Sequence, residues 1–439
     1  MPATADRIYT SRDSPNPSIT NPSRGRNYVF EMKNIAAAVL AVTGFAALGP
    51  AQADLGTDTA KLVNLLYQDT RQDCGGSDKP AYMCSGLVMR AVVPTTAYEF
   101  YSVSPPSVAR GGVSASYLRK DVKFQKTARD IKSGFIFYPV MDNPASHVDY
   151  KVLCAYPYDG YTDTRTKNGC GDSSWSASAE DTCDRLGIST AEQWVQHYRK
   201  AGTDWGQCGF DVREAASNPA GAFHQFIRAS SMINDKRFNG YEGQETELVI
   251  APWSMEAPRA PSLMATFYVG DAGIQASRLS QIQWYRTTRQ MLPAIRMQLP
   301  QTAQQDATFN YDANAQAILP ITAENRCEKY VQSAKWVKRY DPGFRKELMS
   351  LVVVPTACGR AIQESQTNNF FNEMVAGYYL QPEWSNNPDN AMGSVMGMRR
   401  QLVCLFNTAR SKSEWYMEPS RPNTTHAKSI AASCNNTTS

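Results

Sequence analysis

The chain of 439 residues is close to electrically balanced, with 45 Lys and Arg against 41 Asp and Glu. Such a balance argues against a nucleic-acid binder that works by neutralising phosphates. The length exceeds what one ordinary hydrophobic core fills, so we expect two domains.

The N-terminal segment predicts export. Residues 32–53 contain one lysine, an apolar stretch from Ile35 to Leu48 and the small-residue site Ala51-Gln52-Ala53, which together indicate a signal peptide cleaved before Asp54. An apolar stretch of about 14 residues is too short to span a membrane comfortably, and no later segment reaches the required length. Residues 1–31 are rich in Ser, Pro, Asn and Arg, which predicts a disordered extension or a start codon placed too early.

The first half of the remaining chain mixes strands and helices. Residues 85–92, 133–141, 149–156, 245–253 and 263–270 are rich in β-branched and aromatic residues and predict strands. Between them, Ser189 to Glu192 forms a capping box that opens a helix ending at Gly202, and residues 222–230 predict a second helix. Strands at both ends with helices between them predict an α+β fold with a mixed or antiparallel sheet.

Residues 299–325 predict a linker between two domains. The segment is rich in Gln, Ala, Asn and Thr, is nearly uncharged, and contains Pro300 and Pro320, with at most a short element at 314–319. It separates a domain at 54–298 from a smaller one at 326–439. The second domain contains one clear strand, 348–357, and fewer helical signals, so we expect it to be β-rich.

All ten cysteines follow the predicted cleavage site. An even number in an exported chain indicates disulfides, and no C-x-x-C or H-x-x-x-H pair begins a zinc site. Spacing alone leaves the connectivity open. The simplest pairing is sequential: Cys74–Cys84, Cys154–Cys170, Cys183–Cys208, Cys327–Cys358 and Cys404–Cys434.

Glu245 and Glu247 place two carboxylates one residue apart at the start of the predicted strand 245–253. Side chains alternate along a strand, so both would lie on one face, roughly 6–7 Å apart. Like charges at that distance repel each other. Either the pair is solvated on an outer face, or a site requires two acids there.

Three motifs in chain order carry a resemblance. Arg90 ends the strand 85–92, Ser114 and Ser116 share one face of the segment 111–121, and the two glutamates follow. This order resembles the arginine, Ser-Thr-Ser and Glu-x-Glu motifs of mono-ADP-ribosyltransferase toxins, although Ala115 replaces the threonine. The long interval between Ser116 and Glu245 would contain a disulfide-bearing insertion, residues 154–208.

The resemblance implies NAD as the substrate, with no bound cofactor. Glu247 would stabilise an oxocarbenium-like ribose, as in glycoside hydrolysis, and Glu245 would position the attacking water or protein acceptor. Ser114 and Ser116 would orient Glu247 and line the nicotinamide pocket. Arg90 would hold the pyrophosphate by charge-assisted hydrogen bonds.

Longer segments resemble a known family. GGVSASYLRKDVKF, SGFIFYPV, CAYPYDGYTDTRTKNGCG and ETELVIAPW are similar to halovibrin, a family of exported bacterial proteins associated with NAD glycohydrolase and ADP-ribosyltransferase activity. The resemblance covers about residues 60–290. Residues 333–360 and 413–423 are similar to an uncharacterised C-terminal domain of exported bacterial proteins.

Two other functions remain open. A non-catalytic exported binding or adhesion protein would carry Glu245 and Glu247 on a convex solvated face, far from Arg90 and Ser114. A secreted hydrolase could use His147 or His197, although no G-x-S-x-G, Walker or G-x-G-x-x-G motif is present. Trp336, Trp384 and Trp415 fit core packing better than a binding face.

Overall fold

The computed structural model describes most of the chain after residue 49. The predicted extension 1–31 and residues 32–49 of the predicted signal peptide lie outside the described residues. Residues 50–53 are the start of helix α1 (Pro50–Gln68). The described residues are 50–92, 112–140, 150–158, 170, 182–201, 207–234, 238, 245–251, 263–288, 290–319, 327–362, 367–379, 381–385, 387–391, 395–422 and 424–437.

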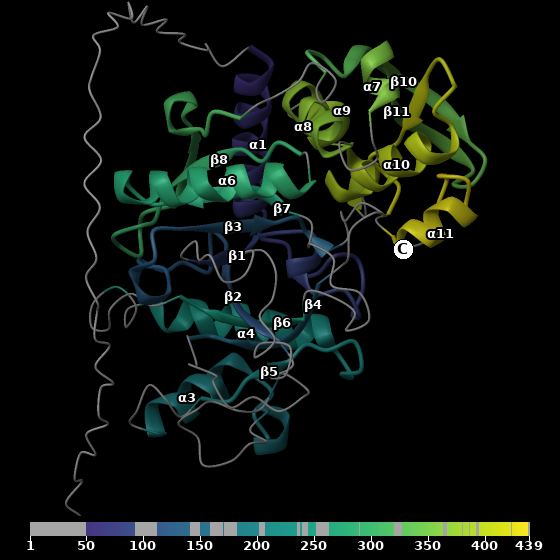
Figure 1. Cartoon of the computed structure of the whole chain (residues 1–439). Coiled ribbons are helices and arrows are strands. Elements are labelled where there is room, and N and C mark those ends of the chain that lie inside the picture. The colour runs from purple at the N-terminus through teal and green to yellow at the C-terminus, as the bar shows by residue number, and fades with distance from the viewer. Residues whose placement is uncertain are drawn as a thin grey trace, which may run out of the picture. The chain divides into compact units, whose positions relative to one another are not determined.

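Among the described residues, nine strands form one mixed sheet in the order β5-β4-β6-β2-β1-β3-β7-β8-β9. Figure 1 shows them following one another from β8 near the top to β5 near the bottom. Neighbours pair antiparallel except β7 and β8, which are parallel. The strands are β1 (Leu87–Ala91), β2 (Val113–Leu118), β3 (Ser133–Phe137), β4 (Lys151–Tyr156), β5 (Phe210–Asp211), β6 (Glu247–Ala251), β7 (Leu263–Tyr268), β8 (Ala294–Gln298) and β9 (Thr308–Tyr311). The predicted α+β class with a mixed sheet is confirmed.

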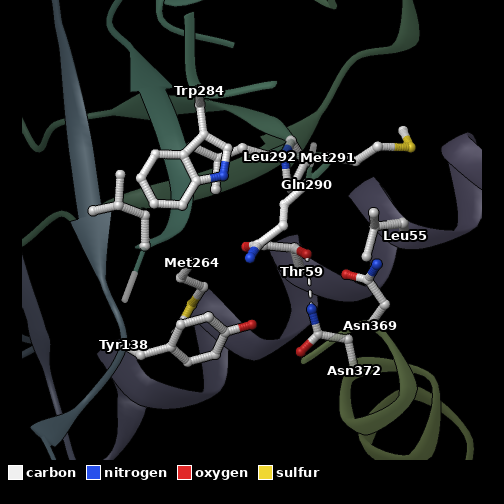
Figure 2. A pocket seen from close by; sticks show the side chains of 12 residues that line it. Leu55, Thr59, Tyr138, Met264, Trp284, Gln290, Met291, Leu292, Asn369 and Asn372 are labelled. Atoms are coloured by element: carbon white, nitrogen blue, oxygen red, sulfur yellow. Dashed lines mark hydrogen bonds between the residues drawn. The ribbon is translucent and has the colours of Figure 1, made fainter. Parts of the chain in front are cut away.

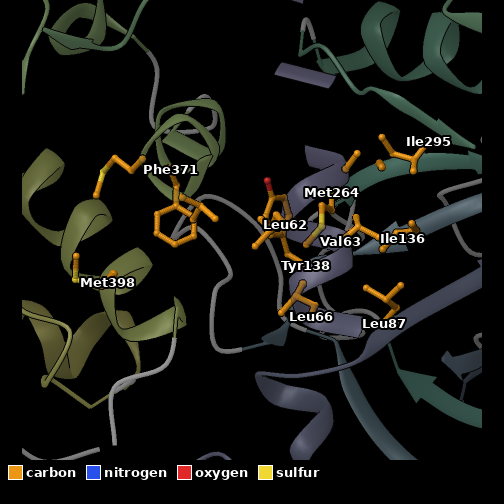
Figure 3. Close-up of a cluster of buried hydrophobic side chains, with 14 of the residues drawn as sticks. Leu62, Val63, Leu66, Leu87, Ile136, Tyr138, Met264, Ile295, Phe371 and Met398 are labelled. Carbon is orange, nitrogen blue, oxygen red and sulfur yellow. The ribbon is translucent and has the colours of Figure 1, made fainter. Parts of the chain in front are cut away.

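Helix α1 covers one face of this sheet. Its residues Leu62, Val63 and Leu66 are 3% exposed or less and recur at helical spacing, so they form a single apolar stripe. Figure 3 shows this stripe beside Ile136 of β3 and Met264 of β7. No helix was predicted here, although the stripe is legible in the sequence.

Helices α6 (Ile274–Thr288) and α4 (Pro219–Met232) cover the opposite face. The ring of Tyr117 on β2 lies 5.1 Å from that of Phe223 on α4, and the hydroxyls of Thr266 on β7 and Ser277 on α6 are 2.7 Å apart. Because both faces are covered, β3 and β7 are buried along their whole length.

Helix α3 (Ala191–Ala201) packs on α4, and the residues that cap its N-terminus differ from the predicted ones. The capping residues are Thr190 and Gln193, one position later than the predicted Ser189 and Glu192. Thr190 Oγ1 accepts from the Gln193 amide at 3.2 Å, and Gln193 Oε1 accepts from the Ser189 amide at 2.8 Å. This register buries Ala191 and leaves Glu192 exposed, where it pairs with Arg228 of α4.

The linker prediction is wrong for residues 299–319. Strand β9 pairs with β8 and completes the sheet, and the buried side chain of Gln316 extends the pairing. Its amide nitrogen donates to the Ala294 carbonyl at 2.9 Å, and its oxygen accepts from the Ala294 amide at 2.8 Å. Residues 299–319 therefore belong to the large sheet and do not form a linker. Residues 320–326 lie outside the described part of the chain.

The C-terminal region is smaller and β-rich, as predicted, and the structure shows a three-stranded antiparallel sheet in it. Trp384 and Trp415 are fully buried in its core, in agreement with the packing role expected for them. The sequence predicts fewer helices in this region than the structure contains. The elements are β10 (Val331–Asp341), β11 (Lys346–Pro355), β12 (Trp415–Met417), α7 (Ala357–Ala361), α8 (Thr367–Tyr378), α9 (Pro382–Ser385), α10 (Val395–Thr408) and α11 (His426–Ala431).

Helix α8 packs against α1, so one hydrophobic cluster runs from the large sheet into the C-terminal region. Phe371 of α8 belongs to this cluster together with Leu62 of α1. Short 3-10 turns complete the described elements: Ala81–Met83, Ala128–Asp130, Asp184–Leu186, Asp271–Gly273, Ala313–Ala315 and Pro388–Ala391.

Five disulfides close local loops, and their sequential connectivity is confirmed. Their Cα–Cα distances run from 4.8 to 5.8 Å, within the usual range for a disulfide. Among the described residues, no helix combines the length and apolar character needed to cross a membrane.

Candidate functional site

The two glutamates sit at the entrance of β6, and neither is solvated. Strand β6 begins at Glu247, so Glu245 precedes it. Glu245 is 7% exposed and Glu247 is 2% exposed. Glu245 lies before the strand, so the structure does not test whether its side chain shares the face of Glu247. A solvated outer face does not describe the pair. Residues 252 and 253 of the predicted strand lie outside the described residues.

Thr246, between the glutamates, fastens this entrance to β2. Its fully buried hydroxyl accepts from the Tyr117 amide at 2.9 Å and donates to the Tyr117 carbonyl at 3.1 Å. The side chain thus replaces one rung of the backbone ladder and fixes the position of Glu247 against β2. Nothing in the sequence around Thr246 predicts its contact with Tyr117.

Glu247 and the serines share one face of the sheet. Residues directly opposite each other on paired strands point to the same side. Ser114 stands opposite Val249 and Ala115 opposite Leu248, so the next pair in this register is Ser116 with Glu247. On the other side of β6, Tyr156 of β4 stands opposite Glu247.

The serine nearest the acid holds it directly. Ser114 Oγ donates to Glu247 Oε1 at 2.6 Å, although the two residues are 133 positions apart in the chain. A hydroxyl donating to a carboxylate is a charge-assisted bond and is shorter than a neutral one. Ser116 is 1% exposed, and its hydroxyl finds no hydrogen-bond partner within the described structure. Both serines therefore lie where they can act on Glu247 or on a group beside it.

Arg90 lies on the other face of the sheet. On β1, Met89 stands opposite Ser116, and the next residue, Arg90, stands opposite Phe135 of β3. Phe135 packs in the cluster beneath α4 and α6. Because side chains alternate along a strand, the Arg90 side chain leaves β1 away from Glu247. The structure brings together Ser114, Ser116 and Glu247 but not Arg90.

Among the described residues, His197 and His224 show no catalytic pairing. His147 lies outside the described residues. His197 and His224 are half-buried, and neither hydrogen-bonds to a serine or carboxylate in the described part of the chain. Burial, with smaller effects from Arg228 and Arg119, lowers the pKa of His224 below its ordinary value of 6.5. A group of three His, Cys, Asp or Glu side chains able to hold a metal ion is also lacking among the residues described.

A cavity lies apart from the glutamates, where α1, the ends of β3 and β7, α6 and α8 meet. Its volume is about 400 Å³ including its open mouth. Figure 2 shows Trp284, Tyr138 and Asn372 among its lining side chains. In the sheet order, β2 and β1 separate β6 from β3, so this cavity and Glu247 belong to different places in the fold.

The C-terminal region contains a buried ionic cluster that was not predicted. Arg421 is 1% exposed, donates from Nε to Glu418 Oε2 at 2.6 Å, and also binds Asp341. Ser350 Oγ donates to the other oxygen of Glu418 at 2.8 Å. Sequence shows Glu418 and Arg421 three positions apart, but a spacing of three gives no sign of burial.

Comparisons with known proteins identify the C-terminal region only. Residues 331–437 match a family model described as "Protein of unknown function (DUF2599)", and the match begins at the first residue of β10. Neither a curated protein nor a solved structure matches the chain.

Proposed function

We propose that the protein is an exported enzyme that cleaves the nicotinamide–ribose bond of NAD, by hydrolysis or by transfer of ADP-ribose to a protein. The observation that carries the proposal is the 2.6 Å hydrogen bond between Ser114 and the buried Glu247. The motifs that resemble mono-ADP-ribosyltransferases and halovibrin assign this relation to the same two residues: a serine orients the acid that faces the ribose.

The chemistry explains why one buried carboxylate is enough. When the bond breaks, its electron pair stays with nicotinamide, which leaves as a neutral molecule and needs no general acid. The ribose becomes oxocarbenium-like, and a fixed negative charge beside it lowers the barrier. A buried charge acts more strongly than a solvated one because less water screens it. Glu247 supplies this charge, and Glu245 positions the water or the acceptor that attacks the ribose.

The surroundings of Glu247 support this role. Ser114 holds one carboxylate oxygen, and the hydroxyl of Ser116, which has no partner among the described residues, is available to the substrate. The strand register directs the Arg90 side chain to the opposite face of the sheet, which disfavours the expected role of Arg90 as the pyrophosphate ligand. Pyrophosphate binding on the Glu247 face therefore requires another group.

Export is part of the proposal. The five disulfides are typical of proteins that fold in an oxidising compartment. The predicted signal peptide at 32–53 would direct the chain there.

The test is release of free nicotinamide. The protein with native disulfides is incubated with NAD, and nicotinamide is measured by chromatography. We expect turnover by the wild type and a loss of about 100-fold or more in Glu247→Gln. Glu214→Gln is the matched control, because the Glu214 side chain is 89% exposed and should be dispensable. No nicotinamide from the wild type, or a wild-type rate in Glu247→Gln, would refute the proposal.

The same incubation separates hydrolysis from transfer. Hydrolysis yields free ADP-ribose in an amount equal to the nicotinamide released. Transfer leaves a deficit of free ADP-ribose and a matching modification on an added protein.

A non-catalytic exported binding protein is the alternative. It draws on the C-terminal region, where Tyr340 is 62% and Tyr416 37% exposed on the small sheet. It does not account for Glu247, which the binding function would leave solvated. A protein that binds cell surfaces but never consumes NAD would favour this alternative.

A further inference from the structure

The entrance of β6 is held to β2 by a side chain instead of a backbone bond. The regular register of the two strands runs as far as Ala115 and Leu248. Two residues further along β2, the Tyr117 amide donates to Thr246 Oγ1 at 2.9 Å, and the same oxygen donates to the Tyr117 carbonyl at 3.1 Å. In an antiparallel ladder, these two backbone groups would bind the backbone of the residue opposite. A hydroxyl therefore stands between the two main chains at this point.

The Thr246 side chain has little freedom in this position. Thr246 is fully buried, its one hydroxyl proton goes to the Tyr117 carbonyl, and a lone pair accepts from the Tyr117 amide. A β-branched side chain is also stiff about χ1. The distance of the Thr246 backbone from β2 therefore depends on this one side chain.

Glu247 is the next residue, and it is bonded to the same strand. Its Oε1 accepts from Ser114 Oγ at 2.6 Å, three residues before Tyr117 on β2. Successive residues of β6 thus join β2 at two points, one through the hydroxyl of Thr246 and one through the carboxylate of Glu247. Two points of attachment fix both the place and the direction of the Glu247 side chain.

Glu245 is separated from the strand at the same residue. The side chain of Thr246 takes up space between the two main chains, and β6 begins only at Glu247. Thr246 therefore lets Glu247 stay on the sheet while Glu245 lies before the strand, which suits the different roles proposed for the two acids.

We propose that Thr246 is a positioning residue of the reaction, an inference that rests on the proposed cleavage of NAD by Glu247. Its hydroxyl holds the Glu247 carboxylate where the positive charge develops on the ribose. Electrostatic stabilisation depends on the place of the charge, and a displacement of about 1 Å can reduce a rate about 100-fold. Because Thr246 is fully buried, it does not contact the substrate. Its loss should therefore lower kcat and leave KM nearly unchanged.

Variants of Thr246, measured by nicotinamide release per folded molecule, test the proposal. Thr246→Val keeps the shape and removes the hydroxyl, so kcat should fall about 10- to 100-fold while KM stays within about twofold. Thr246→Ser restores the hydroxyl and should recover most of the lost kcat. Thr246→Ala leaves room for a water at the Tyr117 backbone, should also lower kcat, and serves if Thr246→Val fails to fold.

Thr266→Val is the matched control. Thr266 of β7 is also fully buried, and its hydroxyl lies 2.7 Å from that of Ser277 on α6. In the sheet order, β2, β1 and β3 separate β7 from β6. The control variant should therefore be less stable than the wild type and keep the wild-type kcat.

The outcomes separate this inference from the proposed function. If the wild type releases no nicotinamide, the proposed function fails, and the role of Thr246 fails with it. If the wild type cleaves NAD, a wild-type kcat in Thr246→Val or a rise in KM in place of the fall in kcat would overturn the inference alone. An equal loss of kcat in Thr266→Val, or a kcat in Thr246→Ser as low as in Thr246→Val, would do the same.

Discussion

Two buried glutamates in this molecule are held in different ways. Glu247 in the large sheet is 2% exposed and accepts a hydrogen bond from the Ser114 hydroxyl at 2.6 Å. Glu418 in the C-terminal region is 1% exposed and accepts a hydrogen bond from the Ser350 hydroxyl at 2.8 Å. Glu418 also receives the guanidinium of Arg421 at 2.6 Å. By register, Ser116 and Tyr156 stand opposite Glu247 on the two neighbouring strands.

The difference separates a structural acid from one suited to a reaction. A buried carboxylate beside a buried guanidinium forms an internal ion pair. Removing either partner leaves the other charge buried and uncompensated. In the proposed reaction, Glu247 instead acts on a positive charge that develops on the substrate. Accordingly, Glu418 should matter for stability and Glu247 for chemistry.

The largest effect should come from breaking the C-terminal cluster. Arg421→Met leaves Glu418 and Asp341 buried without their shared cation, so we expect a loss of about 3–5 kcal/mol in the free energy of unfolding. Urea denaturation measures it. Arg339→Met is the control: Arg339 is 37% exposed and 3.5 Å from Glu418, so its loss should cost about 1 kcal/mol or less. Equal losses in the two variants would show that burial does not determine how much the Arg421–Glu418 ion pair contributes to the free energy of unfolding.

The two glutamates themselves give the next test. Glu418→Gln removes the charge that faces Arg421, and we expect a loss of about 2–3 kcal/mol. Glu247→Gln keeps an oxygen that accepts from Ser114, so its free energy of unfolding should change by about 1 kcal/mol or less. The comparison fails if Glu247→Gln is as destabilising as Glu418→Gln, because Glu247 would then be structural as well.

The sequence was sufficient to predict the contact between Ser114 and Glu247 but not the position of Arg90. The Ser-x-Ser and Glu-x-Glu motifs each lie in a segment expected to be extended. The resemblance to mono-ADP-ribosyltransferases predicts that the two motifs meet in one site. The face of Arg90 depends on register, because Met89 rather than Arg90 stands level with Ser116. A shift of one residue would have turned Arg90 toward Glu247, and no local pattern fixes that parity.

The separation of two partners along the chain also explains which other contacts the sequence predicts and which it does not. The five disulfides were predictable because each closes a loop of at most 31 positions. Strand β9 was missed because its composition resembles that of a linker. Pairing with β8 and the bonds of Gln316 to Ala294 hold the segment. The hydrogen bond between Thr59 and Asn372, which both line the cavity, joins residues 313 positions apart, a distance at which sequence patterns carry no information.

Alkaline pH should weaken the sheet on the face opposite Glu247. Burial raises the pKa of Tyr117 from 10.0 to about 12, although Arg119 and a hydrogen bond to Ser85 lower it slightly. The folded protein keeps this phenol protonated while the unfolded chain releases its proton. The stability is therefore complete below pH 10 and is lost between about pH 10 and 12, by roughly 2–3 kcal/mol. Chemical denaturation at stepped pH should show this slope.

Tyr117→Phe is the control for that slope. The variant loses the hydroxyl that donates to the Ser85 carbonyl at 3.0 Å, so it should be somewhat less stable at neutral pH. Its stability should fall less steeply between pH 10 and 12. An unchanged slope would assign the alkaline loss to other groups, such as Tyr67 and Tyr311, whose pKa values are also raised to about 12 by burial.

The smallest effect should come from His224, and it distinguishes the two faces of the sheet. Burial lowers the pKa of His224, so the folded state resists the proton that the unfolded chain accepts below its ordinary value of 6.5. Stability is therefore present above pH 6.5 and decreases as the pH falls below it. The charged groups that act on this histidine are Arg228, Arg119 and Asp121. His224→Gln should flatten this acid slope in denaturation curves. Since α4 and Glu247 lie on opposite faces, the variant should release nicotinamide at the wild-type rate, and a large loss of turnover would instead place a histidine in the chemistry.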